Sequence, residues 1–129
     1  MKFSISNIAW PIEWDADIFK ALKELGFHAI EIAPNRTISN GYSSTNEEIL
    51  EWNKLYSEYY QEVSSMQSLL YRVETQIFES EENMATILET LKQGLDFASK
   101  LKVRNIVFGS PSIRNVYNDQ QRSRSNIFF

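Results

Sequence analysis

Polar and apolar side chains alternate from Lys2 to Ala9, which predicts a first β-strand. One face of that strand would carry Phe3, Ile5 and Asn7. A second strand is predicted over residues 27–33, where apolar residues run up to Pro34. Proline lacks the N–H donor that a central strand needs, so this strand should end there.

Helical spacing predicts a helix between these strands and another after the second strand. In the first helix, Asp15 is the expected N-cap and Gly26 the left-handed stop. A turn over residues 39–43 precedes the next helix, which should begin with a capping box of Ser44 and Glu47 and end near Tyr60. The apolar positions of the two helices are Ile18, Phe19, Leu22 and Leu25, then Ile49, Trp52, Tyr56 and Tyr59 or Tyr60.

The second half repeats the alternation of strand and helix. Residues 63–67 predict a third strand, and the large apolar side chains of the loop 69–80 are expected to pack on the core. A long helix should run from a cap at Ser80 to Leu101, followed by a fourth strand over residues 103–108. The continuous apolar run of that strand predicts burial on both faces. The apolar stripe of the long helix is Met84, Ile87, Leu88, Leu91, Leu95 and Ala98.

This βαβαβαβ order favours a parallel α/β architecture. We interpret residues 1–129 as a single partial domain, with residues 118–129 as an unfinished helix or a mobile tail. Strand order distinguishes two forms of the sheet. The order 1-2-3-4 indicates an arc of a barrel, and 2-1-3-4 indicates a doubly wound, flavodoxin-like sheet.

Composition narrows the classes of function. The chain has 129 residues, a formal charge of −4 and no cysteine, which excludes disulfides, iron–sulfur clusters and Cys-containing zinc sites. The negative charge gives no attraction to nucleic acid or to an anionic membrane. No apolar run is long enough for a signal peptide or a membrane span, so we expect a cytoplasmic protein with neither nucleic acid nor membrane as partner.

Candidate binding residues lie where the predicted parallel strands end, because these ends meet on one rim. His28 opens the second strand at the opposite end, so we expect it to be structural or at the surface. The sequence also lacks GxGxxG, Walker A and HExxH motifs. The candidates for substrate binding are Asn7, Trp10, Glu31, Gln67, Gly109, Ser110 and Arg114.

Glu31 is the most informative candidate, because a carboxylate inside an apolar strand must be paired or line a polar pocket. The alternative to a binding role is an ion pair with Arg36. Asn7 either binds a polyol, orients Glu31 or forms a strand-end turn, and Gln67 either lines a pocket or begins a loop.

The loop from Gly109 to Pro111, with Arg114, either presents backbone donors and a guanidinium to a phosphate or is a plain strand exit. Three aromatic side chains near the predicted rim also have two interpretations. Trp10, Tyr71 and Phe78 either stack on a sugar or cover the core, and we favour core cover.

Four motifs in order resemble the sugar phosphate isomerase/epimerase family of the xylose isomerase-like TIM barrels. They are Ser6-Asn7-Ile8-Ala9-Trp10; Gly26-Phe27 with Glu31-Ile32-Ala33-Pro34; Ser65-Met66-Gln67-Ser68-Leu69-Leu70; and Val107-Phe108-Gly109-Ser110-Pro111 with Arg114. The resemblance implies roughly the first half of a (β/α)₈ barrel, with Asn7, Glu31, Gln67 and Arg114 on the carboxyl-end rim.

The same resemblance implies chemistry on sugars. Full-length relatives are expected to use a divalent metal (Mn, Mg or Zn) held mostly by Glu, Asp and His residues of strands five to eight, which this chain is expected to lack. The leading hypothesis is therefore the N-terminal half of a sugar (phosphate) isomerase or epimerase, which binds substrate but no metal and is inactive alone. The alternatives are a non-catalytic α/β module for a phosphorylated ligand or a protein partner, and an inactive truncated fragment.

Assembly follows from the half-barrel interpretation. A barrel needs about 250 residues, so 129 residues leave two sheet edges unpaired and an inner face uncovered. We expect self-association or pairing with a complementary half-barrel, with an apolar inner face protected by the partner or by the tail from Asn118 to Phe129. The side chains expected to need protection are Phe3, Ile5, Ile106 and Phe108.

Overall fold

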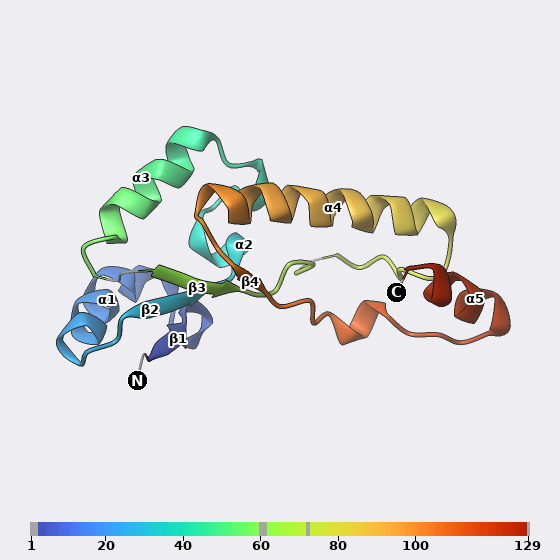
Figure 1. Cartoon of the computed structure of the whole chain (residues 1–129), viewed down its shortest axis with the longest axis horizontal. Helices are drawn as coiled ribbons and strands as arrows, with labels where there is room; N and C mark the ends of the chain where they lie inside the picture. The colour runs from blue at the N-terminus through green and yellow to red at the C-terminus, as the bar shows by residue number, and fades with distance from the viewer. Residues whose placement is uncertain (1–2, 60–61, 72, 129) are drawn as a thin grey trace.

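A computed structural model describes residues 3–59, 62–71 and 73–128 as a parallel sheet with helices packed along it (Figure 1). The strands are β1 (Ser4–Ser6), β2 (Ala29–Ile32), β3 (Glu62–Met66) and β4 (Asn105–Ile106). The helices are α1 (Asp15–Glu24), α2 (Pro34–Thr37), α3 (Asn46–Tyr56), α4 (Glu81–Lys100) and α5 (Asp119–Phe128). Lys2, Tyr60 and Phe129, where predicted elements begin or end, lie outside the described residues.

The strands are hydrogen-bonded in the order β1-β2-β3-β4, and each pair is parallel. The predicted parallel α/β class is therefore confirmed, and the sequential order is compatible with half of a barrel. The order 2-1-3-4 of the flavodoxin-like alternative is wrong for this chain. The described helices contain none that is long and apolar enough to cross a membrane.

The core lies between the sheet and the helices. Ile30, Ile32, Val63 and Met66 from the two central strands are buried there. The helices contribute Phe19, Ile49, Ile87 and Phe97. Figure 1 shows α3 and α4 on one side of the sheet.

The opposite face of the sheet carries polar side chains rather than the expected apolar ones. Ile5 and Ile106 pack against the helix-covered core, so the prediction that they line an uncovered apolar face is wrong. Strand alternation leaves Ser4, Ser6 and Glu31 on the other face, where they are exposed or half-buried. This face needs no apolar cover.

The long connections after β3 and β4 run beside each other below α4 (Figure 1). Ile77 N donates to Ile113 O at 2.9 Å, which ties the two connections together. The predicted packing of the loop 69–80 is confirmed, with Leu69, Leu70, Ile77 and Phe78 all buried. The tail forms α5, and Arg124 of this helix donates to the carbonyls of Phe78 and Glu79.

Several local predictions change. Asp15 does not cap α1, because its carboxylate bonds elsewhere, whereas Gly26 does adopt the left-handed conformation after α1, with φ of 78°. The capping box of α3 is formed by Thr45 and Glu48, one residue later than expected, since Ser44 Oγ instead donates to Gly41 O. The cap of α4 at Ser80 is confirmed.

Two strands end earlier than predicted. The first ends at Ser6, so Asn7 lies in a 3₁₀ turn, Asn7–Ala9, instead of on the strand. The fourth is an edge strand of two residues, and Val107 is 47% exposed, so the predicted burial on both faces is wrong.

Candidate functional site

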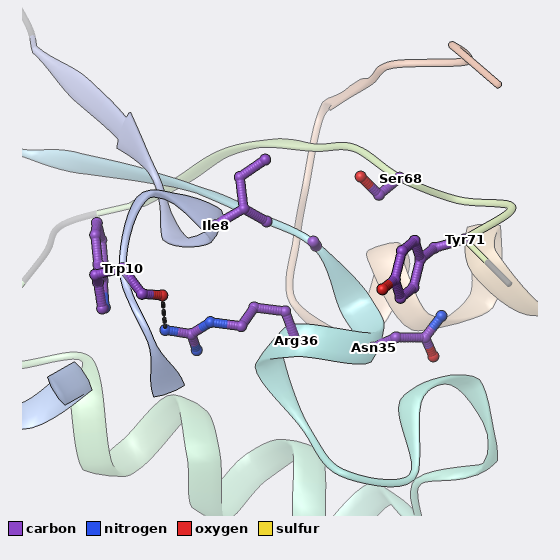
Figure 2. A pocket seen from close by; sticks show the side chains of 7 residues that line it. Ile8, Trp10, Asn35, Arg36, Ser68 and Tyr71 are labelled. Atoms are coloured by element: carbon purple, nitrogen blue, oxygen red, sulfur yellow. Dashed lines mark hydrogen bonds between the residues drawn. The ribbon is translucent and has the colours of Figure 1, made fainter. Parts of the chain in front are cut away.

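The segments that follow β1, β2 and β3 enclose a pocket of about 420 Å³ at the carboxyl ends of the strands. Figure 2 shows Ile8 and Trp10 on one side, Ser68 and Tyr71 on the other, and Asn35 and Arg36 arriving from α2. We call this cavity the rim pocket; Ala33 completes its lining. Its lining combines apolar, amide, hydroxyl and aromatic groups, as small-molecule sites commonly do.

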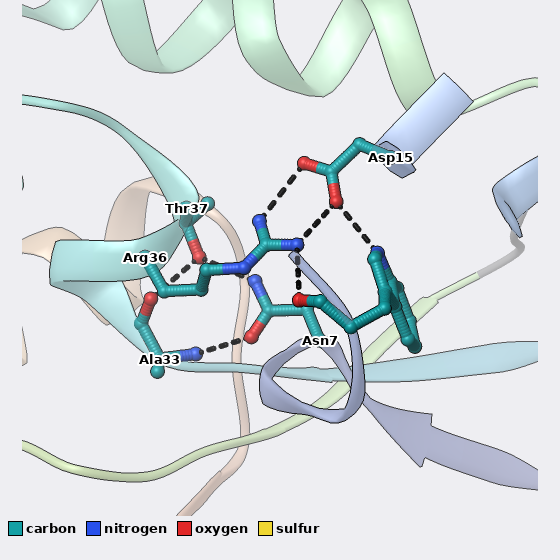
Figure 3. A network of polar contacts seen from close by, with 6 residues as sticks. Asn7, Asp15, Ala33, Arg36 and Thr37 are labelled. Carbon is teal, nitrogen blue, oxygen red and sulfur yellow. Dashed lines mark hydrogen bonds and ion pairs between the residues drawn. The ribbon is translucent and has the colours of Figure 1, made fainter. Parts of the chain in front are cut away.

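Arg36 is held in the pocket wall by Asp15, which lies at the start of α1. Arg36 Nη2 donates to Asp15 Oδ1 at 2.6 Å and Nη1 donates to Oδ2 at 3.0 Å (Figure 3). The two side chains are only 16% and 6% exposed. The positive charge of Arg36 is therefore balanced inside the protein, and the alternative of a Glu31–Arg36 ion pair is wrong.

Trp10 belongs to the same network. Its indole Nε1 donates to Asp15 Oδ1 at 2.8 Å, and its carbonyl accepts from Arg36 Nη2 at 3.2 Å. The indole packs edge-on against Phe19 and is 9% exposed. In Figure 2 it points away from Tyr71, so Trp10 covers the core, as favoured.

Asn7 is fully engaged within the chain rather than facing the rim pocket. Its Oδ1 accepts from Ala33 N at 3.0 Å and its Nδ2 donates to Thr37 Oγ1 at 3.1 Å (Figure 3). Asn7 is 1% exposed. These bonds fasten the end of β1 to the turn between β2 and α2, which places Asn35 and Arg36.

Glu31 and Gln67 lie on the face of the sheet away from the helices. Ser65 Oγ donates to Glu31 Oε2 at 2.6 Å, and Gln67 Nε2 donates to Ser6 Oγ at 2.6 Å. The strand register pairs Ser6 with Glu31 and Glu31 with Ser65. We call Ser6, Glu31, Ser65 and Gln67 the polar face. Two of the predicted substrate-binding residues, Glu31 and Gln67, therefore lie on the same face, near the carboxyl ends of three neighbouring strands.

The loop after β4 is divided between two places. Ser110 lines a second cavity of about 250 Å³, next to the rim pocket, together with Ser68 and Tyr71. Gly109, the residue before Ser110, does not line this second cavity. The Arg114 guanidinium lies 5.6 Å from the Phe108 ring centre and lines neither cavity, so the structure does not join Arg114 and Ser110 in one phosphate cradle.

A larger groove, of about 850 Å³, lies at the other end of the sheet. Lys100, Lys102 and Arg104 line it beside the start of β3. In parallel α/β folds, ligands bind at the carboxyl ends of the strands, where loops and helix starts converge. The rim pocket is therefore the better candidate despite its smaller volume. His28 precedes β2 and so lies at the groove's end of the sheet, as predicted.

The described residues do not by themselves fit a divalent metal. Among residues 3–59, 62–71 and 73–128, no three His, Asp or Glu side chains come together. On the polar face Glu31 is the only carboxylate, and its neighbours Ser65 and Gln67 are weaker ligands.

Sequence reasoning missed part of the rim pocket. Asn35 and Ser68 were not candidates, and Tyr71 is 58% exposed in the pocket wall, so core cover is wrong for it. Phe78, at 2% exposure, does cover the core. The available signal was position, because Asn35 and Ser68 each follow the end of a strand within three residues.

No protein-family model matches the chain, and no curated protein matches it.

Proposed function

We propose that this chain supplies the substrate-binding half of a sugar isomerase or epimerase built as a (β/α)₈ barrel. The sequential parallel sheet supports this, because four consecutive strands of such a barrel have the same order. The rim pocket lies where ligands of these barrels bind. The residues that match the sugar phosphate isomerase/epimerase motifs flank this rim, with Glu31 and Gln67 facing what would be the barrel interior.

One observation carries the proposal: Glu31 stands on the polar face with a single described partner, Ser65 Oγ, at 2.6 Å. A carboxylate in this position can accept hydrogen bonds from a sugar's hydroxyls. It can also hold the proton that moves between neighbouring carbons in isomerisation or epimerisation. The bond from Ser65 orients the carboxylate, and Oε1 has no partner among the described residues.

The rest of the proposed site binds and orients. Gln67 is fixed by Ser6 and offers its amide oxygen at the end of β3. Asn35 and Ser68 offer an amide and a hydroxyl in the rim pocket, and Tyr71 offers an aromatic face for a sugar ring. These groups explain affinity and orientation, and we propose that this half alone does not turn over substrate.

We further propose that a complementary half-barrel, or a second copy of the chain, closes the sheet around the polar face. β1 and β4 are the outer strands, so each has one edge without a strand partner among the described residues. A parallel partner joined at both edges would place the polar face inside the barrel and keep all carboxyl ends on one rim.

The test measures binding of D-fructose and D-fructose 6-phosphate to the purified chain by isothermal titration calorimetry. We expect Glu31→Gln to weaken binding about tenfold or more, since a hydrogen bond to a charged group contributes about 1.5–3 kcal/mol. His28→Ala is the matched control, at the other end of β2, and should leave binding unchanged. Equal effects of the two substitutions would refute the rim assignment.

An activity assay tests the second part of the proposal. The purified chain is incubated with Mn²⁺ or Mg²⁺ and a panel of ketoses and ketose phosphates. We expect binding without turnover. Robust turnover would show that the chain is a complete enzyme and that the half-site proposal is wrong.

A non-catalytic α/β binding module remains a second candidate, and the polar face favours it. A sheet whose free face is polar can stay in water without a second half. Solvent deuterium distinguishes the two: in the assembled two-half complex, an isomerase site exchanges a substrate C–H proton, whereas a binding module leaves it untouched.

A further inference from the structure

Two serines in the connections that follow adjacent strands adopt the left-handed backbone conformation. Ser68 follows β3 with φ of 56°, and Ser110 follows β4 with φ of 45°. Non-glycine residues rarely adopt this conformation, because the Cβ crowds the backbone. Lys102 is the third such residue among those described, and it lies at the opposite end of the sheet.

Both strained serines line the same cavity. The second cavity, of about 250 Å³, is lined by Ser68, Leu70, Tyr71, Val73, Ser110 and Ser112. It shares Ser68 and Tyr71 with the rim pocket. The two cavities are therefore neighbours, separated by these two side chains.

The hydroxyls of the two serines have no hydrogen bond to another described residue. Each carbonyl accepts a backbone bond instead, Ser68 O from Tyr71 N and Ser110 O from Ile113 N. Ser110 precedes a 3₁₀ turn, Pro111–Ile113, without capping it through its side chain. Both residues are half-buried. Strain at a position where the side chain serves no internal bond is a feature of ligand-binding sites.

The charge around both cavities indicates an uncharged ligand. The second cavity has no cationic or acidic lining residue among those described. Arg36 is the one charged side chain among the described residues that line the rim pocket, and Asp15 neutralises it. Arg114, the predicted phosphate contact, lines neither cavity. Among the described lining residues, a phosphate would find no free cation to offset the loss of its hydration.

Volume indicates an extended ligand. Sites for small molecules usually measure about 300–1,000 Å³. The rim pocket, at about 420 Å³, is near the lower limit, and the second cavity, at about 250 Å³, is below it. The smaller cavity therefore serves better as an extension of the larger one than as a separate site.

We propose that Ser68 and Ser110 form a hydroxyl subsite that binds the second ring or chain of an uncharged polyhydroxylated ligand, while the rim pocket binds the first. This inference rests on the proposed sugar-binding function and narrows its substrate class to unphosphorylated sugars larger than a monosaccharide. Tyr71 lies between the two parts of the ligand and contacts both.

Three probes test the inference by calorimetry on the full chain: D-fructose, D-fructose 6-phosphate and the disaccharide lactulose. We expect lactulose to bind about tenfold more tightly than D-fructose, because its second ring adds two hydroxyl contacts, to Ser68 and Ser110. We expect D-fructose 6-phosphate to bind more weakly than D-fructose.

Glycine substitution separates binding from folding. Ser110→Gly removes the hydroxyl and also relieves the left-handed strain, so Tm should rise while the advantage of lactulose is lost. D-fructose affinity should stay unchanged, because Ser110 does not line the rim pocket. Lys102→Gly is the matched control: it relieves the same kind of strain and should raise Tm without changing the affinity of any probe.

The outcomes separate the two proposals. If D-fructose binds but the phosphate form binds more tightly, or lactulose shows no advantage, the subsite inference is wrong and the sugar-binding function stands. The same conclusion follows if Ser110→Gly preserves the advantage of lactulose. If none of the three probes binds, the proposed function fails and the subsite fails with it.

Discussion

Arg36 and Asp15 form a doubly hydrogen-bonded ion pair that joins α2 to the start of α1, with N–O distances of 2.6 and 3.0 Å. The pair is largely shielded from solvent, and its Arg36 side lines the rim pocket. It positions the pocket wall and at the same time removes the free positive charge that a phosphate would need.

Asp15→Asn should destabilise the fold by about 2–3 kcal/mol, because it leaves the Arg36 guanidinium buried without a counter-charge. Urea unfolding followed by circular dichroism measures this loss. The matched control is Glu89→Gln, which breaks the exposed Lys92–Glu89 pair at 3.5 Å and should change stability by less than about 0.5 kcal/mol. Equal losses would contradict the structural importance of the buried pair.

The same Asp15→Asn variant has a second expected effect, on ligand charge. Freeing Arg36 should strengthen binding of D-fructose 6-phosphate relative to D-fructose, since the pocket wall gains an unbalanced cation. Calorimetry at about 10 °C, near the usual temperature of maximum stability, gives this ratio. An unchanged ratio would mean that the neutralised arginine does not determine the preference for uncharged ligands.

Gly94 of α4 and Tyr42 form a close packing contact. A Cβ added at Gly94 would lie 3.0 Å from Tyr42 Oη, and that hydroxyl is held by a hydrogen bond to Leu69 O at 3.0 Å. Gly94→Ala should therefore destabilise the fold by about 1–2 kcal/mol, although alanine favours a helix by about 1 kcal/mol over glycine. Urea unfolding provides the measurement.

The same substitution in a Tyr42→Ala background is the control. With the ring absent, Gly94→Ala should instead stabilise the helix by up to about 1 kcal/mol. A loss in both backgrounds would show that the contact with Tyr42 is not the cause.

Tyr42 also predicts a pH dependence. Burial raises the pKa of its hydroxyl from 10.0 to about 12, so the folded chain holds this proton more tightly than the unfolded chain. The resulting stability is complete below pH 10 and is lost as the pH rises through 12. Because the ring is only partly buried, we expect a loss on the order of 1 kcal/mol.

Comparison with Tyr42→Phe isolates this effect, since the variant cannot ionise there and should lose less stability between pH 9 and 12. Burial also raises the pKa of Tyr56, and the hydrogen bond to Glu58 raises that of Tyr59, so the wild-type slope contains their contributions too. Exposed Tyr117 serves as control through Tyr117→Phe. If the free energy of unfolding falls with pH equally steeply in the unsubstituted chain and in Tyr42→Phe, the prediction is contradicted.

Among the described residues, β1 and β4 each leave one edge without a strand partner, which predicts self-association at micromolar concentration, measured by analytical ultracentrifugation. Val107→Lys places a charge beside the free edge of β4, where Val107 is already 47% exposed, and should shift the population toward monomer with the fold retained. If the unsubstituted chain and the Val107→Lys variant are both compact monomers, the stand-alone binding module is favoured over the half-barrel.

The sequence predicts correctly those features whose structure depends only on residues that are near each other in the chain. The cap at Ser80 and the stop at Gly26 are local features, and both are found where the sequence predicts them. The capping box shifted by one residue because Ser44–Glu47 and Thr45–Glu48 have the same spacing and chemistry. Only the turn before them, which engages Ser44 with Gly41, decides between the two.

Contacts between residues that are far apart in the chain could not be predicted from the sequence. Asp15 looks like an N-cap and Arg36 looks like a partner for Glu31, and nothing in their spacing indicates that they pair with each other. Val107 belongs to an apolar run, but it follows Ile106, which packs on the core, and so lies on the opposite face, where it is 47% exposed. Ser68 and Ser110 line the second cavity and have a positive φ. Glycine is the residue that normally indicates a positive φ in a sequence, so two serines gave no such signal.

Titration of D-fructose into the ¹⁵N-labelled chain, followed by NMR, tests most directly the claim that the carboxyl-end rim binds sugar. The account predicts amide shift changes at Glu31, Asn35, Ser68 and Tyr71, with none at the opposite groove around Lys102 and Arg104. Changes confined to that groove, or no changes at any sugar concentration, would contradict it.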